Sequence, residues 1–144
     1  MVNLANNHGQ DYGTTAMLDG LLQSRLAGLE PVGVGADLSG ATTPAIIEVG
    51  GWRIAVLGMG GVVPGEIWLA TDERPGMASG DDIEQMTASV RAAAEIADFV
   101  FVTIHLLLLF HVIGRNHGDS VPSHPRSRGF LHCDFDRVLP RRLY

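Results

Sequence analysis

The sequence contains no lysine, and all ten of its basic residues are arginines. Cys133 is the only cysteine, which excludes an intramolecular disulfide and a cysteine-based zinc knuckle. The longest apolar run, residues 99–113, includes two histidines and is shorter than the roughly 20 residues that a membrane helix needs. The first eight residues lack the basic and apolar regions of a signal peptide. We therefore expect no membrane span and no disulfide-stabilised scaffold.

Positive charge is scarce in the first three quarters of the chain. Residues 1–105 hold four Arg and thirteen Asp or Glu, whereas residues 106–144 hold six Arg and three acids. Nucleic-acid binding needs a cationic face that neutralises phosphates, so this acidic body argues against a nucleic-acid partner. The basic tail leaves one alternative open, a small binding module that works through residues 106–144.

The pattern of apolar residues predicts an α/β domain over residues 1–105. A strand over 2–5, a helix capped by Thr14 or Thr15 and ended by Gly28, and a strand over 31–34 would form a βαβ unit. Further along the chain we expect a hairpin of 45–49 and 52–57 around Gly50-Gly51, a loop over 58–76, a helix opened by Ser79 with Asp82 three positions on, and a strand over 99–104.

Residues 106–144 have a different character. The run Leu106–Phe110 shows neither helical nor alternating periodicity, and an Arg-, His-, Ser- and Pro-rich stretch follows it. Such a stretch cannot bury enough apolar surface to offset its ordering entropy, so we expect a poorly ordered tail. The apolar run itself predicts self-association through Leu106–Phe110.

Asn7 and His8 directly follow the first predicted strand, and Asp11 comes three residues after His8. Loops after strand C-termini are where α/β folds place functional groups. An amide oxygen can bind a divalent metal, and an imidazole can donate a proton to a leaving group. A plain turn is the alternative, because Asn, His and Gly all suit turns. His105, at the end of strand 99–104, is either a metal ligand near Asn7 and His8 or a histidine that merely flanks the strand.

The segment Asn6-Asn7-His8-Gly9-Gln10-Asp11-Tyr12-Gly13, followed by a helix and Gly33-Val34-Gly35, resembles the Asn-Asn-His-x-x-Asp-x-Gly block of CapA-type poly-γ-glutamate capsule-synthesis proteins. The resemblance covers residues 2–105. That family is similar to calcineurin-like metallophosphoesterases, which have a β-sandwich flanked by helices and a two-metal site at the strand ends. The implied fold is a partial metallophosphoesterase-like β-sandwich of the α/β class.

The resemblance also implies roles for four residues. Asn7 and His105 would be metal ligands, His8 the catalytic acid or phosphate-contacting group, and Asp11 an orienting residue. The implied cofactors are divalent ions (Mn, Mg, Fe or Zn), and the implied reaction is phosphoester hydrolysis. Intact family members would act with the capsule-synthesis machinery, at the cell envelope.

The sequence also departs from the family pattern. The family usually continues Trp-Gly-x-Glu after the histidine at position 105, whereas this chain has Leu106-Leu107-Leu108-Leu109. The Asp-bearing metal loops and the Gly-His-x-x-His ligand block of the superfamily are not matched. A two-metal site needs several carboxylate and imidazole ligands, and Asn7 and His105 are the two that match. The alternative is therefore a catalytically inactive, truncated remnant that binds no metal.

Overall fold

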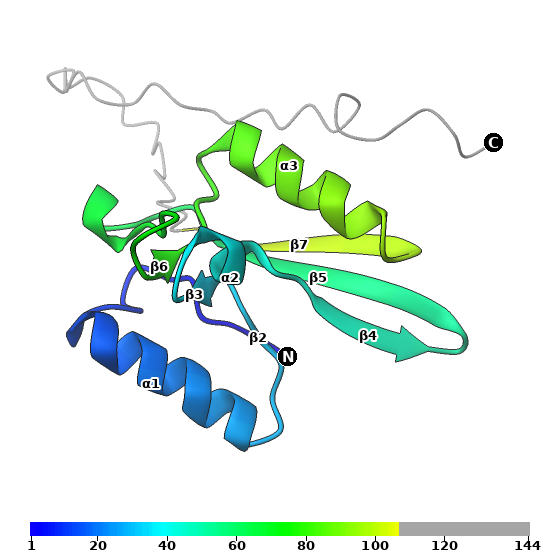
Figure 1. The fold of residues 1–144 in the computed structure, drawn as a ribbon, viewed down its shortest axis with the longest axis horizontal. Helices are drawn as coiled ribbons and strands as arrows, with labels where there is room; N and C mark the ends of the chain where they lie inside the picture. The colour runs from blue at the N-terminus through cyan, green and yellow to red at the C-terminus, as the bar shows by residue number, and fades with distance from the viewer. Residues whose placement is uncertain (107–144) are drawn as a thin grey trace, which may run out of the picture. The chain divides into compact units, whose positions relative to one another are not determined.

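The computed structural model describes residues 1–106, which form a mixed α/β fold (Figure 1). The helices are α1 (Gly13–Leu26), α2 (Leu38–Thr42) and α3 (Ile83–Ala94), and a short 3-10 helix, η1 (Glu66–Trp68), lies between α2 and α3 in the sequence. The strands are β1 (Val2–Asn3), β2 (Pro31–Val32), β3 (Val34–Gly35), β4 (Ala45–Val49), β5 (Trp52–Gly60), β6 (Gly76–Met77) and β7 (Phe99–His105). The predicted α/β class is confirmed.

The first sheet is the predicted βαβ unit. Strands β1 and β2 run parallel on either side of α1 in the sequence, with Val2 opposite Pro31. Gly28 takes φ +75° just past α1, as expected of a residue that ends a helix. The predicted threonine cap is wrong, because α1 already begins at Gly13 and its N-cap, Tyr12, makes no side-chain bond to the helix.

Gly33 divides the predicted strand 31–34 into two strands. Its φ of +88° is a left-handed conformation that glycine adopts without a steric penalty. Strand β2 before it pairs with β1, whereas β3 after it pairs antiparallel with β6. The chain thus moves from one sheet to another at a single residue.

The third sheet has the order β4-β5-β7. Its hairpin turns at Gly50 and Gly51, with φ of +59° and +87°, which confirms the hairpin. Strand β5 runs on to Gly60, into the region predicted as a loop, because β7 pairs with it in parallel from Ile54–Phe99 to Gly60–His105. The carboxyl ends of two parallel strands therefore lie side by side.

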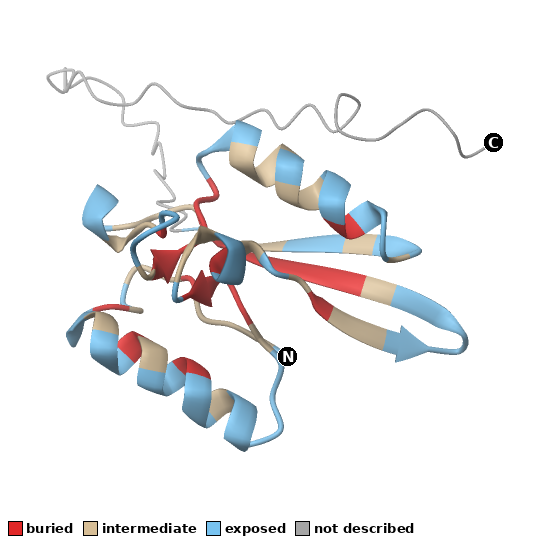
Figure 2. Ribbon diagram, in the orientation of Figure 1, coloured by how far each residue is buried: buried red, intermediate tan, exposed pale blue. Residues whose placement is uncertain are grey.

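Helix α3 covers one face of this sheet. The core between them consists of apolar residues, coloured red and tan in Figure 2: Ala55, Leu57, Met59, Met86, Val90, Ala93, Val100 and Ile104. Asp82 is the N-cap of α3 and accepts a hydrogen bond from the Gln85 N–H at 2.9 Å. The prediction that Ser79 opens this helix is wrong, since Ser79 Oγ instead accepts from the N–H groups of Asp81 and Asp82.

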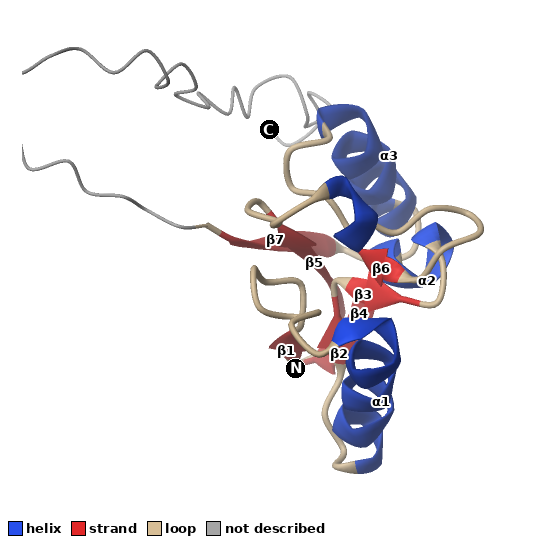
Figure 3. Ribbon diagram, turned by 90° about the vertical axis from the view of Figure 1, so that its left-hand side faces the viewer, coloured by secondary structure: helices blue, strands red, loops and turns tan. Residues whose placement is uncertain are grey.

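Helices α1 and α3 lie on opposite sides of the short strands β3 and β6, as both Figure 1 and Figure 3 show. A second core, formed by Ala5, Met17, Leu21, Val34 and Met77, joins α1 to these strands. None of the helices in residues 1–106 is both long and apolar enough to cross a membrane. The predicted Arg-rich tail and the run Leu106–Phe110 lie outside the described residues, except for the exposed Leu106.

Candidate functional site

The loop after β1 is held by the Asn6 side chain. Asn6 Oδ1 accepts the His8 N–H at 2.9 Å, and Asn6 Nδ2 donates to the Leu4 carbonyl at 3.1 Å. The Gly9 N–H closes the turn on the Asn6 carbonyl at 3.0 Å. A Cβ at Gly9 would lie 2.9 Å from the Leu4 carbonyl oxygen, so only glycine fits this approach. These bonds fix the loop conformation that carries Asn7 and His8.

Asn7 and His105 meet although 98 positions separate them in the sequence. Asn7 Oδ1 lies 3.0 Å from His105 Nε2, and both residues are half-buried. His105 is the last residue of β7, and its carbonyl accepts the Gly61 N–H at 3.0 Å. The site thus joins the loop after β1 to the carboxyl end of β7.

His8 and Asp11 form a second pair within the same loop. His8 Nδ1 lies 2.8 Å from Asp11 Oδ2, and the two side chains are 73% and 45% exposed. At that exposure an ion pair adds little to stability. A carboxylate at Nδ1 does, however, orient the imidazole and leaves Nε2 free to contact a ligand.

Two residues that sequence reasoning missed support this loop from inside the fold. Asn3 Nδ2 donates to the carbonyls of Met59 and Thr103, at the ends of β5 and β7. Gln10 is 7% exposed and donates to the Trp68 carbonyl at 2.8 Å. A polar residue between the apolar Val2 and Leu4 was the one signal in the sequence that pointed to Asn3.

The Asn7–His105 pair suits one edge of a divalent-metal site. Two ligands of one octahedral cation, each about 2.1 Å from it, lie about 3.0 Å apart, which is the spacing of Asn7 Oδ1 and His105 Nε2. An amide oxygen and an imidazole nitrogen are also suitable donors for Mn²⁺, Fe²⁺ or Zn²⁺. Within residues 1–106, however, no group of three or more His, Cys, Asp or Glu side chains gathers around one point. The candidate ligands that the described residues bring together are therefore Asn7 and His105.

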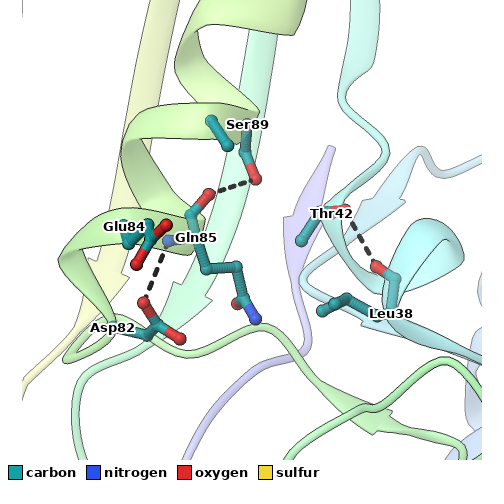
Figure 4. Close-up of a pocket in the computed structure, with 7 residues that line it drawn as sticks. Leu38, Thr42, Asp82, Glu84, Gln85 and Ser89 are labelled. Carbon is teal, nitrogen blue, oxygen red and sulfur yellow. Dashed lines mark hydrogen bonds between the residues drawn. The ribbon is translucent and has the colours of Figure 1, made fainter.

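A separate shallow pocket lies between α2 and the start of α3 (Figure 4). Several of its polar groups are already bonded inside their own helices. Asp82 caps α3, Ser89 Oγ donates to the Gln85 carbonyl at 2.8 Å, and Thr42 Oγ1 donates to the Leu38 carbonyl at 2.8 Å. These bonds are helix-capping and back-bonding contacts, so the loop after β1 remains the better candidate site.

Known proteins share this sequence pattern. The family model described as "Bacterial capsule synthesis protein PGA_cap" matches residues 1–127. A "Probable polyglutamine synthesis accessory protein" of Mycobacterium tuberculosis is 34% identical over 112 residues, which cover 71% of this chain and 29% of that protein. The "Capsule biosynthesis protein CapA" of Bacillus anthracis is 33% identical over 109 residues, covering 73% and 26%. The "PGA biosynthesis protein CapA" of Bacillus subtilis is 35% identical over 106 residues, covering 73% and 27%.

The chain spans less than a third of the length of these curated relatives. The family match nevertheless includes every residue of the site, from Asn3 to His105. The chain belongs to the bacterial capsule synthesis protein PGA_cap family.

Proposed function

We propose that this chain takes part in poly-γ-glutamate capsule biosynthesis through a metallophosphoesterase-like domain, of which residues 1–106 carry one side of the active site. The observation that carries the proposal is the contact between Asn7 Oδ1 and His105 Nε2 at 3.0 Å. It places an amide oxygen and an imidazole from distant parts of the chain at the spacing of two ligands of one cation.

Each residue of the site has a chemical role in this proposal. Asn7 and His105 would hold a divalent cation (Mn, Mg, Fe or Zn), which when bound supplies Lewis acidity toward phosphoryl oxygens. His8 would contact the phosphate and donate a proton to the leaving oxygen. Asp11 would accept a hydrogen bond from His8 Nδ1 and so leave Nε2 as the nitrogen that contacts the phosphate.

The finer fold, a metallophosphoesterase-like β-sandwich, is supported by the face of the β4-β5-β7 sheet that α3 does not cover. Register and side-chain alternation place Ile47, Val49, Trp52, Ile54, Phe99 and Phe101 on that face. The rings of Trp52 and Phe99 pack edge to face, with centroids 5.5 Å apart. Phe101 is 59% exposed in residues 1–106. An apolar outer face is typical of a sheet that packs against a second sheet.

A chain without activity of its own is the second candidate. The observation that favours it is the short ligand set, because residues 1–106 bring one histidine and one asparagine together and hold no group of three or more His, Cys, Asp or Glu side chains. Under this alternative the Asn7–His105 contact is a structural hydrogen bond between two ends of the domain.

Titration of the purified chain with Mn²⁺ in a calorimeter separates the two candidates. We expect stoichiometric binding that the Asn7→Ala/His105→Ala double variant loses. The His8→Ala variant is the matched control: it should still bind Mn²⁺ but should lose hydrolysis of a chromogenic phosphodiester. Equal binding by the parent chain and the double variant, or none by either, would establish the inactive alternative.

A further inference from the structure

Asn3 connects three segments through one side-chain amide. Its Nδ2 donates to the Met59 carbonyl at 3.3 Å and to the Thr103 carbonyl at 3.2 Å, while its Oδ1 accepts the Ala5 N–H at 3.0 Å. The Ala5 N–H belongs to the segment that leads into the loop carrying Asn7. We infer that Asn3 is a positioning residue, which sets the distance between the loop after β1 and the end of β7.

The pattern of partners requires an amide at this position. Asn3 donates to two carbonyl oxygens and accepts from one N–H, and a –CONH₂ group supplies two donors and an acceptor at once. A carboxylate would keep the bond to the Ala5 N–H but would face two carbonyl oxygens. A hydroxyl would be too short to bridge both strands.

Glycine backbone approaches this side chain closely on two sides. A Cβ at Gly33 would lie 2.5 Å from Asn3 Oδ1, and a Cβ at Gly58 would lie 2.7 Å from the same atom. Gly33 follows β2 and Gly58 lies in β5, so two sheets approach the amide from different directions. Close approach of glycine backbone on two sides indicates a site built around the Asn3 side chain.

The consequence for the site follows from the strand ends. Thr103 lies two residues before His105 on β7, and Ala5 lies two residues before Asn7. The Asn3 bonds to Thr103 and Ala5 therefore brace the Asn7–His105 contact from both sides. This geometric role does not depend on a metal. Its effect on metal affinity rests on the function proposed above.

The test compares Asn3→Asp, which loses both donor bonds, with Gln23→Glu, an amide-to-carboxylate change at an exposed position on α1. In metal-free, ¹⁵N-histidine-labelled protein, the His105 Nε2 resonance is assigned with His105→Ala. It is then followed as Asn7→Ala is introduced into each background. We expect Asn7→Ala to shift the His105 Nε2 resonance in the parent protein and in Gln23→Glu but not in Asn3→Asp. Mn²⁺ affinity should fall on the order of tenfold in Asn3→Asp, as for other residues that orient ligands.

Each outcome separates the two proposals. If Asn7→Ala shifts the His105 Nε2 resonance equally in the parent protein and in Asn3→Asp, the positioning role of Asn3 is overturned. If the shift is lost in Asn3→Asp but neither the parent nor any variant binds Mn²⁺, the positioning role of Asn3 is supported and the proposed metal function is overturned. Circular dichroism reports whether Asn3→Asp folds. If it does not, the neutral Asn3→Ala replaces it and is judged by the same comparison.

Discussion

Asp98 and Arg53 exchange two hydrogen bonds: the Arg53 N–H donates to Asp98 Oδ2 at 2.7 Å, and the Asp98 N–H donates to the Arg53 carbonyl at 2.8 Å. The pair lies one residue before the first β5–β7 pair, Ile54 and Phe99. It therefore sets the register in which β7 adds to the sheet.

Replacing Asp98 by alanine should lower the free energy of unfolding by about 1 kcal/mol, because the Arg53 N–H loses its side-chain acceptor. Denaturant unfolding monitored by circular dichroism measures this. Asp98→Asn keeps an acceptor oxygen and should stay close to the parent protein. A change below about 0.5 kcal/mol in Asp98→Ala, the range of ordinary surface substitutions, would contradict the role in register.

Gly58→Ala should destabilise the fold by about 1–3 kcal/mol, as expected of overpacking. The new Cβ would lie 2.6 Å from Val32 Cγ2 and 2.7 Å from Asn3 Oδ1. Gly20→Ala is the matched control, since Gly20 is inside α1 and, apart from the backbone around it in that helix, no atom lies within 4 Å of a Cβ there. That control should be more stable than the parent by about 0.5–1 kcal/mol. Equal midpoints of thermal unfolding for the two variants would show that Val32 and Asn3 do not exclude a side chain at position 58.

Two neighbouring aspartates at the start of α3 should respond differently to alanine. Asp82 accepts the Gln85 N–H as the N-cap, so Asp82→Ala should cost about 1 kcal/mol of folding free energy. Asp81 is exposed and precedes the cap, so Asp81→Ala should have an effect below about 0.5 kcal/mol. Urea unfolding of both variants checks this. An equal loss in both would assign the effect to charge rather than to capping.

The Asn7–His105 contact should be energetically coupled without any metal. A double-mutant cycle of Asn7→Ala and His105→Ala should give a coupling energy of about 0.5–1.5 kcal/mol in the free energy of unfolding. The measurement is made with a chelator present. Additive single effects would mean that the two side chains do not hold each other in solution.

Much of the fold could be predicted because local signals agreed with the final structure. The glycine pair at 50 and 51 predicted the hairpin, and apolar residues at helical spacing from Ile83 to Ala97 predicted the helix that is α3. Both are decided by residues close in sequence. The βαβ unit of β1, α1 and β2 was predictable for the same reason.

Besides the two helix starts, errors occurred where distant contacts decide the conformation. Strand β5 extends to Gly60 because β7, about 45 positions later, pairs with it. Helix α2, five residues long, was missed; its N-cap Asp37 accepts the Gly40 N–H, and the Leu38 N–H donates to the Thr71 carbonyl.

The local part of the candidate site could be predicted from the sequence. Asn7, His8 and Asp11 fall in one short motif, so the His8–Asp11 pair is local. That Asn7 reaches His105, and that Asn3 braces them, depends on where β1 lies relative to β5 and β7. No periodicity carries that information, because β1 is two residues long.

Gly33 connects two sheets, since it lies between β2 and β3, and its carbonyl accepts the Ala78 N–H at 2.9 Å. We expect local opening of β1–β2 to disturb β3–β6 as well, because Gly33 connects β2 directly to β3. Amide hydrogens in the two ladders should therefore exchange with solvent as one cooperative unit. Any other residue at position 33 would be strained by the positive φ, and its Cβ would lie 2.5 Å from Asn3 Oδ1. We therefore expect position 33 to require glycine.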